Sequence, residues 1–280
     1  MSNRIGERLL RRTRQQLGGT WVKDAYLASW HGLYGAERVI RRRLESSDRL
    51  CRRLQVYGRK VHSQNDEDGI LEYLFSRIPP SESFFVEIGV GPPWRGGALQ
   101  DVAKTGLECN CRLLAERGWR GLYLDGESYP PSLGVTQGFV TAENINELLV
   151  DNGVPEDFDL FSLDIDGNDY WVWKALKYQP RVVIMEYNAA IAATESKTIP
   201  YNPSFSWSAH GRTAYYGASL LALQRLGTQK GYTLVYANGV NAFFVLSALV
   251  PNRADFSYER IYRYKDCHAA LRGDEVWQEV

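Results

Sequence analysis

The sequence predicts an α/β protein with a mostly parallel, Rossmann-like sheet of seven strands that ends in an antiparallel hairpin. Two observations support this prediction. Short apolar runs alternate with helical segments between residues 63 and 230, an order typical of a parallel sheet with helices on both faces. Residues 232–237 and 241–246 then both resemble strands, and only Asn238-Gly239-Val240 separates them. Because a connection of three residues cannot hold a crossover helix, this last pair must be antiparallel.

The individual elements follow from local signals. Ser63 is expected to cap a helix, because its hydroxyl can accept a backbone N–H in the first turn. Acidic residues 66–68 would lie at the positive end of the helix dipole, and Pro79-Pro80 would end the helix. Further strands are expected at 84–88, 121–125, 139–141, 158–164 and 181–186, with helices over 107–117, 144–150, 170–176 and 217–230.

Size and composition are those of a globular protein. The chain has 280 residues, 44% hydrophobic and 24% charged, enough for one large α/β domain with extensions. No apolar run approaches the roughly 18 residues that cross a bilayer, and the N-terminus lacks the apolar core of a secretory signal. Cys109 and Cys111 do not have the spacing of zinc ligands. We therefore expect a cytoplasmic protein with free thiols and no transmembrane segment.

The charge is unevenly distributed along the chain. Residues 1–60 contain 15 basic and 5 acidic residues, a net charge of +10, so residues 61–280 carry −10 of the total of zero. We expect 1–60 to be a basic helical extension, 61–250 the main domain, and 251–280 a C-terminal tail packed on it. The extension could bind an anionic lipid or a phosphorylated partner, which would make the protein peripherally membrane-associated. It could also pack within a homodimer, or be only a solvated helical face.

The end of the first strand has the pattern of a ligand-binding turn. Ligands of open parallel sheets bind beyond the carboxyl ends of the strands. Glu87-Ile88-Gly89-Val90-Gly91 ends the first strand, and its glycines permit a sharp turn and a close approach to a ligand. A dinucleotide fingerprint would need a third glycine at position 94, which is Trp, while Pro92-Pro93 remove two backbone donors. Pyrophosphate needs such donors, so the turn favours S-adenosylmethionine over NAD.

The next two strand ends supply candidates for the nucleoside. Asp125 ends the second strand, where a carboxylate can accept hydrogen bonds from both ribose hydroxyls. Glu143 and Asn144 follow the third predicted strand, near the expected adenine edge. Asn144 is equally suited to capping the next helix.

Four motifs lie between residues 63 and 169: Ser63-Gln64-x-x-Glu67-Asp68-Gly69, Glu87-x-Gly89-x-Gly91, Gly118-Trp119-Arg120-Gly121-Leu122-Tyr123-Leu124-Asp125-Gly126 and Asp164-Ile165-Asp166-Gly167-Asn168-Asp169. Together they resemble the FkbM-like and TylF-like branches of class I S-adenosylmethionine-dependent methyltransferases. The resemblance implies that S-adenosylmethionine is the cofactor and that Gln64 and Glu67 lie near its methionine end. The Pro-Pro-Trp-Arg insert at 92–95 departs from the usual pattern.

Acidic residues end the fourth and fifth predicted strands. Asp164 and Asp166 should meet Glu186 and Asn188, because adjacent parallel strands end side by side. Carboxylate and amide oxygens suit Mg²⁺, or Ca²⁺ or Mn²⁺, and the resemblance supports such a site. We expect the cation to bind an acceptor diol and lower its pKa. Alternatively, Asp164 contacts only the methionine amine, and 166–168 form a turn with Asn168 or Asp169 as helix cap.

Residues 199–216 follow the fifth strand and are expected to cover the acceptor. His210 is a candidate base because it titrates near neutrality, and Asp164 is a second candidate catalytic residue. Tyr201, Phe205, Trp207, Tyr215 and Tyr216 could stack on a sugar or an aromatic ring.

Together these features predict O-methylation of a hydroxyl on a sugar, glycolipid or secondary metabolite. N- or C-methylation would use the same cofactor pocket. Two alternatives remain: a metal-dependent glycosyltransferase using Asp164-x-Asp166, and a non-catalytic cofactor-binding module.

Overall fold

The computed structural model describes residue 50 and residues 53–91, 107–265 and 275–280. Residues from Arg49 to Val280 form one compact unit. Most of the expected helical extension over 1–60 lies outside the described residues, as do the insert at 92–95 and the two remaining cysteines of the chain, Cys51 and Cys267. Within the part described, residues 54–57 form a short 3-10 helix, η1 (Leu54–Tyr57).

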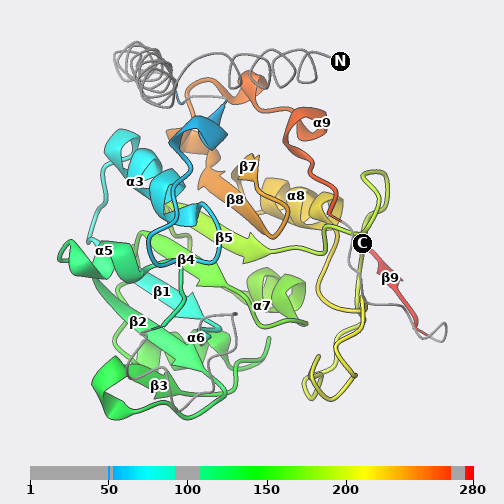
Figure 1. Cartoon of the computed structure of the whole chain (residues 1–280), viewed down its shortest axis with the longest axis horizontal. Coiled ribbons are helices and arrows are strands. Elements are labelled where there is room, and N and C mark those ends of the chain that lie inside the picture. Colours follow the sequence, from blue (N-terminus) through cyan, green and yellow to red (C-terminus); the bar gives the residue numbers. More distant parts are fainter. Residues whose placement is uncertain (1–49, 51–52, 92–106, 266–274) are drawn as a thin grey trace, which may run out of the picture. The chain divides into compact units, whose positions relative to one another are not determined.

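Seven strands form one sheet in the order β3-β2-β1-β4-β5-β8-β7 (Figure 1). Neighbouring strands are parallel except for β8, which is antiparallel to both β5 and β7. The prediction of an α/β protein with a mostly parallel seven-stranded sheet and a terminal hairpin is confirmed, and the order is compatible with a Rossmann-like fold. The strands are β1 (Phe84–Ile88), β2 (Arg120–Asp125), β3 (Val135–Gln137), β4 (Leu160–Leu163), β5 (Val182–Glu186), β7 (Tyr232–Ala237) and β8 (Asn241–Leu246).

The two faces of the sheet have different coverings. Three helices, α6 (Ile145–Asp151), α7 (Asp169–Ala175) and α8 (Leu220–Gln229), share one apolar core with alternate strand residues such as Val86 and Met185. Ser219 caps α8, since its side chain accepts from the backbone N–H of Ala222. Side chains alternate between faces along a strand, so Glu87 and Glu186 point to the opposite face. The remaining helices are α3 (Glu67–Arg77), α5 (Arg112–Glu116) and α9 (Tyr258–Ile261).

Two predicted elements are wrong in their positions. The third strand was expected at 139–141, but the pairing with β2 involves Val135–Gln137, a short edge strand with no alternating apolar pattern. The helix expected over 107–117 begins only at Arg112. The residues before Arg112 make other interactions instead of helical ones. Glu108 pairs with Gly91 as an isolated bridge, and the N–H of Asn110 donates to Glu87.

The expected cap of the first helix is confirmed in part, because the hydroxyl of Ser63 accepts the backbone N–H of Asp68, in the first turn of α3, at 3.3 Å. Asp66 occupies the N-cap position of α3. Ser63 instead lies in a turn closed by Asp68, whose Oδ2 accepts the backbone N–H groups of Val61, His62 and Ser63 at 2.7–2.8 Å. The hydroxyl of Ser63 donates to the same oxygen. The carboxylate of Asp68, inside α3, thus fixes the backbone conformation of the segment that precedes the helix.

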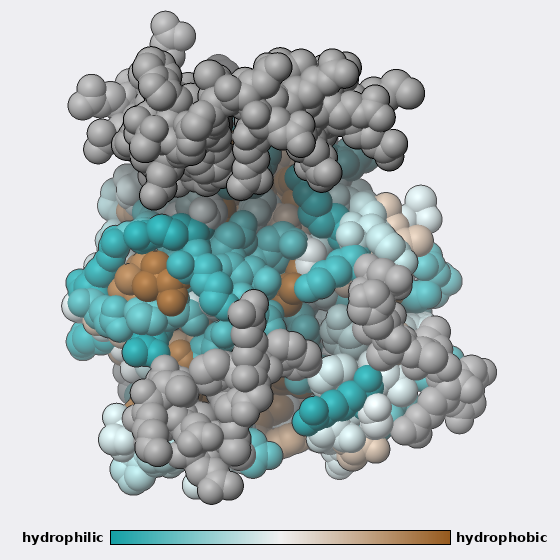
Figure 2. All heavy atoms as spheres, viewed as in Figure 1, coloured by the Kyte–Doolittle hydropathy of each residue, from teal (hydrophilic) through white to brown (hydrophobic). Residues whose placement is uncertain are grey.

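The C-terminal segment lies against the domain. Phe256, Tyr258 and Tyr262 pack on the core shared by α6, α7 and α8. Further along, β9 (Gln278–Glu279) forms a separate two-stranded antiparallel sheet with β6 (Lys197–Thr198). Much of the described surface in view is hydrophilic, with separate hydrophobic areas (Figure 2). Among the described helices, none has both the length and the apolar character required to span a bilayer.

Candidate functional site

One large cavity opens at the carboxyl edge of the sheet. Its volume is about 940 Å³, at the upper end of the roughly 300–1,000 Å³ common for small-molecule sites. Residues at the ends of β1, β2, β4 and β5 line it, together with the turn between β7 and β8. Most of the residues predicted for the site are therefore brought together. They are Gln64, Glu87, Gly89, Gly91, Asp125, Asp164, Asp166 and Glu186.

The two glycines after β1 have different structural roles. Gly89 has φ +82°, and a Cβ there would overlap the carbonyl oxygen of Asp164, so it permits close packing of β1 against the end of β4. A Cβ at Gly91 would meet no described atom. Position 91 lines the cavity, with no described atom where its side chain would lie.

Asp125 supports the turn after β1 as well as lining the cavity. Its Oδ2 accepts the N–H of Val90 at 2.9 Å and its Oδ1 accepts the N–H of Glu127 at 2.8 Å. Burial raises the pKa of Asp125, although these two hydrogen bonds oppose the shift. Each carboxylate oxygen can accept a second hydrogen bond, so the group remains able to bind a pair of ligand hydroxyls.

Glu87 is engaged mainly by the protein itself. Its two oxygens accept the N–H groups of Asn110 at 2.6 Å and Cys111 at 2.9 Å. Burial raises its pKa to about 7. The carboxylate therefore fixes the segment before α5 at the cavity wall, while Cys109 and Cys111 are free and buried.

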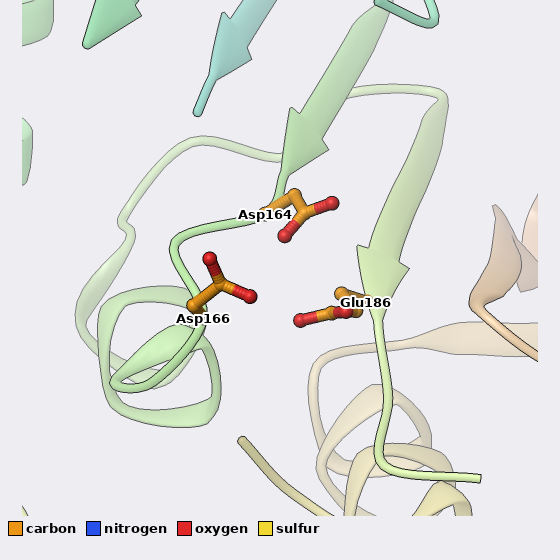
Figure 3. A group of neighbouring side chains, drawn as sticks. All are labelled: Asp164, Asp166 and Glu186. Atoms are coloured by element: carbon orange, nitrogen blue, oxygen red, sulfur yellow. The ribbon is translucent and has the colours of Figure 1, made fainter. Parts of the chain in front are cut away.

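Three carboxylates converge at the ends of β4 and β5. Asp164 directly follows β4, Asp166 precedes α7 and Glu186 ends β5, and the three point toward one another (Figure 3). Each offers an oxygen atom within 4.8 Å of the other two. We call these residues the acidic cluster. The predicted convergence of Asp164, Asp166 and Glu186 thus has the spacing of a cation site.

Electrostatic repulsion is built into the acidic cluster. Burial, followed by the neighbouring carboxylates, raises the pKa of both Asp164 and Glu186 well above their usual ranges. Burial also raises the pKa of Asp166, while the charge of Arg212 lowers it. The Oε2 atom of Glu186 is buried and has no hydrogen-bond partner among the described residues. A divalent cation would neutralise the cluster and satisfy this oxygen, so the donor set fits one.

The loop that carries Asp166 is also a structured turn. Asp169 accepts the N–H groups of Ile165 and Gly167, both at 2.9 Å, and Asn168 takes the N-cap position of α7. Asp166 has φ +54°, an unusual conformation for a residue other than glycine. The turn and the cluster therefore coexist, with Asp169 holding the loop that presents Asp166.

Three predicted cofactor residues do not line the cavity. Glu67 is fully buried and bonds Asn238 and Asn241 of the β7–β8 turn, at 2.7 and 3.0 Å. Glu143 bonds the hydroxyl of Tyr201. Asn144 sits at the N-cap position of α6, and its Oδ1 accepts the N–H of Thr141 at 2.8 Å.

Asn188 and His210 do not line the cavity either. The Nδ2 of Asn188 donates to the carbonyls of Ala214 and Tyr216, and its Oδ1 accepts the N–H of Ala190. The ring of His210 lies near those of Phe205 and Tyr215, with centroids 5.9 and 5.1 Å apart. The amide of Asn188 is therefore engaged by its own loop, whereas the Nε2 of His210 is buried with no hydrogen-bond partner among the described residues.

The cavity also contains residues that the sequence did not single out. Phe139 follows β3 and is 57% exposed at the cavity wall, and its ring packs beside Gly126. The sequence predicts that residue 139 lies in the third strand, so the residue was not expected in the cavity wall. Asn241 lies directly opposite Glu186 in the β5–β8 pair, which depends on a register that the sequence does not encode locally. Of the predicted aromatic residues, Phe205, Trp207 and Tyr216 do line the cavity.

Comparison with known proteins gives no further identification. No protein-family model, curated protein or solved structure matches this chain. The site must therefore be interpreted from its own chemistry. Asp125, the exposed ring of Phe139 and Gly91 all line this cavity.

Proposed function

We propose that this protein is an S-adenosylmethionine-dependent O-methyltransferase, acting on a hydroxyl of a sugar, glycolipid or secondary metabolite, with a divalent cation at the acceptor. One observation carries the proposal. A single cavity crosses the carboxyl ends of β1, β2, β4 and β5 in a sheet whose β8 runs antiparallel between β5 and β7. Open α/β sheets bind ligands at this edge. A terminal antiparallel hairpin is typical of the class I methyltransferases that the motifs resemble.

The end of the cavity near β2 and β3 suits the nucleoside. Asp125 retains acceptor capacity for the two ribose hydroxyls. Phe139 offers an exposed aromatic face next to it, on which an adenine ring can stack. The open space at Gly91 leaves room for the chain that links ribose to the methionine end. These three features support a nucleoside ligand without a pyrophosphate group.

The end near β4 and β5 suits the acceptor. The acidic cluster lines this end, and Phe205, Trp207 and Tyr216 line the same cavity. The indole N–H of Trp207 donates to the carbonyl of Thr213 at 2.7 Å, so its donor is already used and its ring is held in place. Aromatic rings beside hard oxygen ligands match a hydroxylated acceptor with an apolar face.

The chemistry requires alignment and a proton acceptor. A bond forms between the acceptor oxygen and the methyl carbon as the bond from that carbon to sulfur breaks, and its electron pair stays on sulfur. S-adenosylmethionine supplies the activated methyl group, and a divalent cation supplies charge that lowers the pKa of the acceptor hydroxyl. The released proton must pass to a base. Asp164 offers a carboxylate at this point, whereas His210 does not line the cavity.

Calorimetry with S-adenosylhomocysteine tests the proposal. We expect binding to the full chain, and a loss of affinity of about 10- to 100-fold in Asp125→Asn, because a charge-assisted hydrogen bond contributes roughly 1.5–3 kcal/mol. Asp151→Asn, which alters an exposed carboxylate at the end of α6, is the matched control and should bind like the wild type. NAD and a nucleotide sugar with Mn²⁺ are measured in parallel.

Two results would overturn the proposal. The first is no response to S-adenosylhomocysteine at millimolar concentration. The second is binding of the nucleotide sugar in its place, which would favour a glycosyltransferase that uses Asp164 and Asp166. Full methyl transfer to hydroxyl acceptors after EDTA treatment and dialysis would show that no cation is required. The proposal of a methyltransferase would then stand without the cation.

A further inference from the structure

Glu186 and Asn241 lie directly opposite each other in the antiparallel pair of β5 and β8. Side chains directly opposite in such a pair share one face of the sheet, with Cβ atoms about 5 Å apart. The next pair, Met185 and Ala242, points into the core with α6, α7 and α8. Glu186 and Asn241 therefore point to the other face, and both line the cavity.

Each of these two side chains has an oxygen atom without a partner. The Oε2 of Glu186 and the Oδ1 of Asn241 are buried and make no hydrogen bond with any described residue. The side chain of Asn241 is only 3% exposed. Most buried polar atoms in proteins are hydrogen-bonded, and leaving one unpaired costs roughly 1–3 kcal/mol. Two such oxygens on facing residues indicate that a ligand, and not another protein group, binds between them.

The orientation of the Asn241 amide is fixed by Glu67. The Nδ2 of Asn241 donates to Glu67 Oε1 at 3.0 Å. Glu67 is itself held, because its Oε2 accepts the N–H of Asn65 at 2.8 Å and its Oε1 accepts Asn238 Nδ2 at 2.7 Å. A flipped amide would place its oxygen against the Glu67 carboxylate, which repels it. The oxygen is therefore the end of Asn241 that is left for a ligand.

The ligand must be small and electron-poor. Both oxygens are buried acceptors, so their partner must carry positive charge or donate hydrogen bonds, as a water molecule or an organic ammonium group would. A divalent cation without its hydration shell is smaller, and it binds oxygen atoms at roughly 2.0–2.6 Å. Carboxylate and amide oxygens together form a ligand set of this kind. The three carboxylates of the acidic cluster line the same cavity as Asn241.

We propose that Asn241 Oδ1 is a fourth protein ligand of a divalent cation held by Asp164, Asp166 and Glu186. It takes the part that the sequence suggested for Asn188, whose amide oxygen is used by Ala190. Glu67 is then a positioning residue, which orients the Asn241 amide and does not touch the ligand. This inference rests on the cation in the proposed function.

Mn²⁺ binding to the full chain, stripped of metal with a chelator, tests the inference by calorimetry without any need for an acceptor. Asn241→Leu keeps the approximate size of the side chain and removes the oxygen. We expect it to weaken Mn²⁺ binding about tenfold, and Glu186→Gln to weaken it at least as much. Asn252→Leu is the matched control. Asn252 also has an Oδ1 atom without a partner, but it lies outside the cavity, so affinity should not change.

The outcomes separate this inference from the proposal on which it rests. Unchanged Mn²⁺ affinity in Asn241→Leu, with a loss in Glu186→Gln, would overturn the role of Asn241 and keep the cation site. No Mn²⁺ binding by the wild type would overturn both, while S-adenosylhomocysteine binding would still test the cofactor. If Asn241→Leu does not fold, as judged by circular dichroism, Asn241→Ser replaces it. The serine hydroxyl is too short to reach the ion, so the same tenfold loss is expected and unchanged affinity overturns the inference.

Discussion

Gly89 packs directly against the backbone of Asp164, so that the turn after β1 and the acidic residue after β4 are in contact. A side chain at position 89 would overlap the Asp164 carbonyl oxygen, and the backbone has φ +82°. The end of the cavity near β1 and β2 and its acidic end are therefore joined by backbone contact. A change at Gly89 should disturb both.

The first prediction concerns the two glycines of this turn. Gly89→Ala should lower the free energy of unfolding by at least about 2 kcal/mol, because the substitution adds both a clash and backbone strain. Gly91→Ala should change it by less than about 1 kcal/mol, since its Cβ would meet no described atom. Urea denaturation of both variants measures the difference. Equal destabilisation by the two substitutions would contradict the packing described for Gly89.

The second prediction concerns stabilisation by a cation. At 100 times its dissociation constant, Mn²⁺ should raise the free energy of unfolding by about 2.7 kcal/mol, observed as a higher melting temperature. Asp166→Asn should largely abolish the rise, because it removes one charged ligand from the acidic cluster. Asparagine tolerates the φ of +54° at this position, so the fold should persist. A rise of equal size in Asp166→Asn would show that the ion binds elsewhere.

The third prediction concerns pH. Burial raises the pKa of Glu87 in the folded chain from 4.5 to about 7, so between these values the folded state binds more protons than the unfolded state. The contribution of Glu87 is therefore fully present below about pH 4.5 and is lost as pH rises to about 7. The loss is roughly 3 kcal/mol at most. Glu87→Gln cannot ionise and should not show it.

This contribution is measured as a difference between two proteins. Urea denaturation of the wild type and Glu87→Gln is followed from pH 4.5 to pH 8. Contributions from the other acidic residues largely cancel in the difference. The wild type should lose stability relative to the variant across this window, and parallel curves would show that the Glu87 pKa is not raised.

The fourth prediction concerns the edge of the sheet opposite the cavity. Asp159 is fully buried, accepts the N–H groups of Ser81, Glu82 and Phe84, and lies 3.2 Å from the Arg181 guanidinium. Asp159→Asn should cost at least about 2 kcal/mol of folding stability, because a buried carboxylate loses charge-assisted hydrogen bonds and its ion pair with the partly exposed Arg181. Glu82→Gln should cost less than about 1 kcal/mol, since its pairing with Arg120 is exposed. Urea denaturation compares them, and similar losses would contradict the assignment.

Local patterns determined most of the sheet and part of the site. The hairpin strands Tyr232–Ala237 and Asn241–Leu246 have the predicted bounds, because three intervening residues leave no choice of connection. Asp164, Asp166 and Glu186 could be expected together, because neighbouring parallel strands end at one edge. The ends of strongly apolar strands can be recognised in the sequence, and these three residues lie at or near such ends.

Weak elements and long-range pairs needed the tertiary structure. β3 has little apolar pattern, so its position depends on pairing with β2, and only that pairing places Phe139 in the cavity. The pairing of Glu67 with Asn241 joins residues 174 positions apart. No local signal distinguishes Asn241 from Asn188, because each is an amide near the end of a strand. Their roles differ because register and hydrogen bonding leave one amide oxygen unpaired, and these are properties of the assembled sheet.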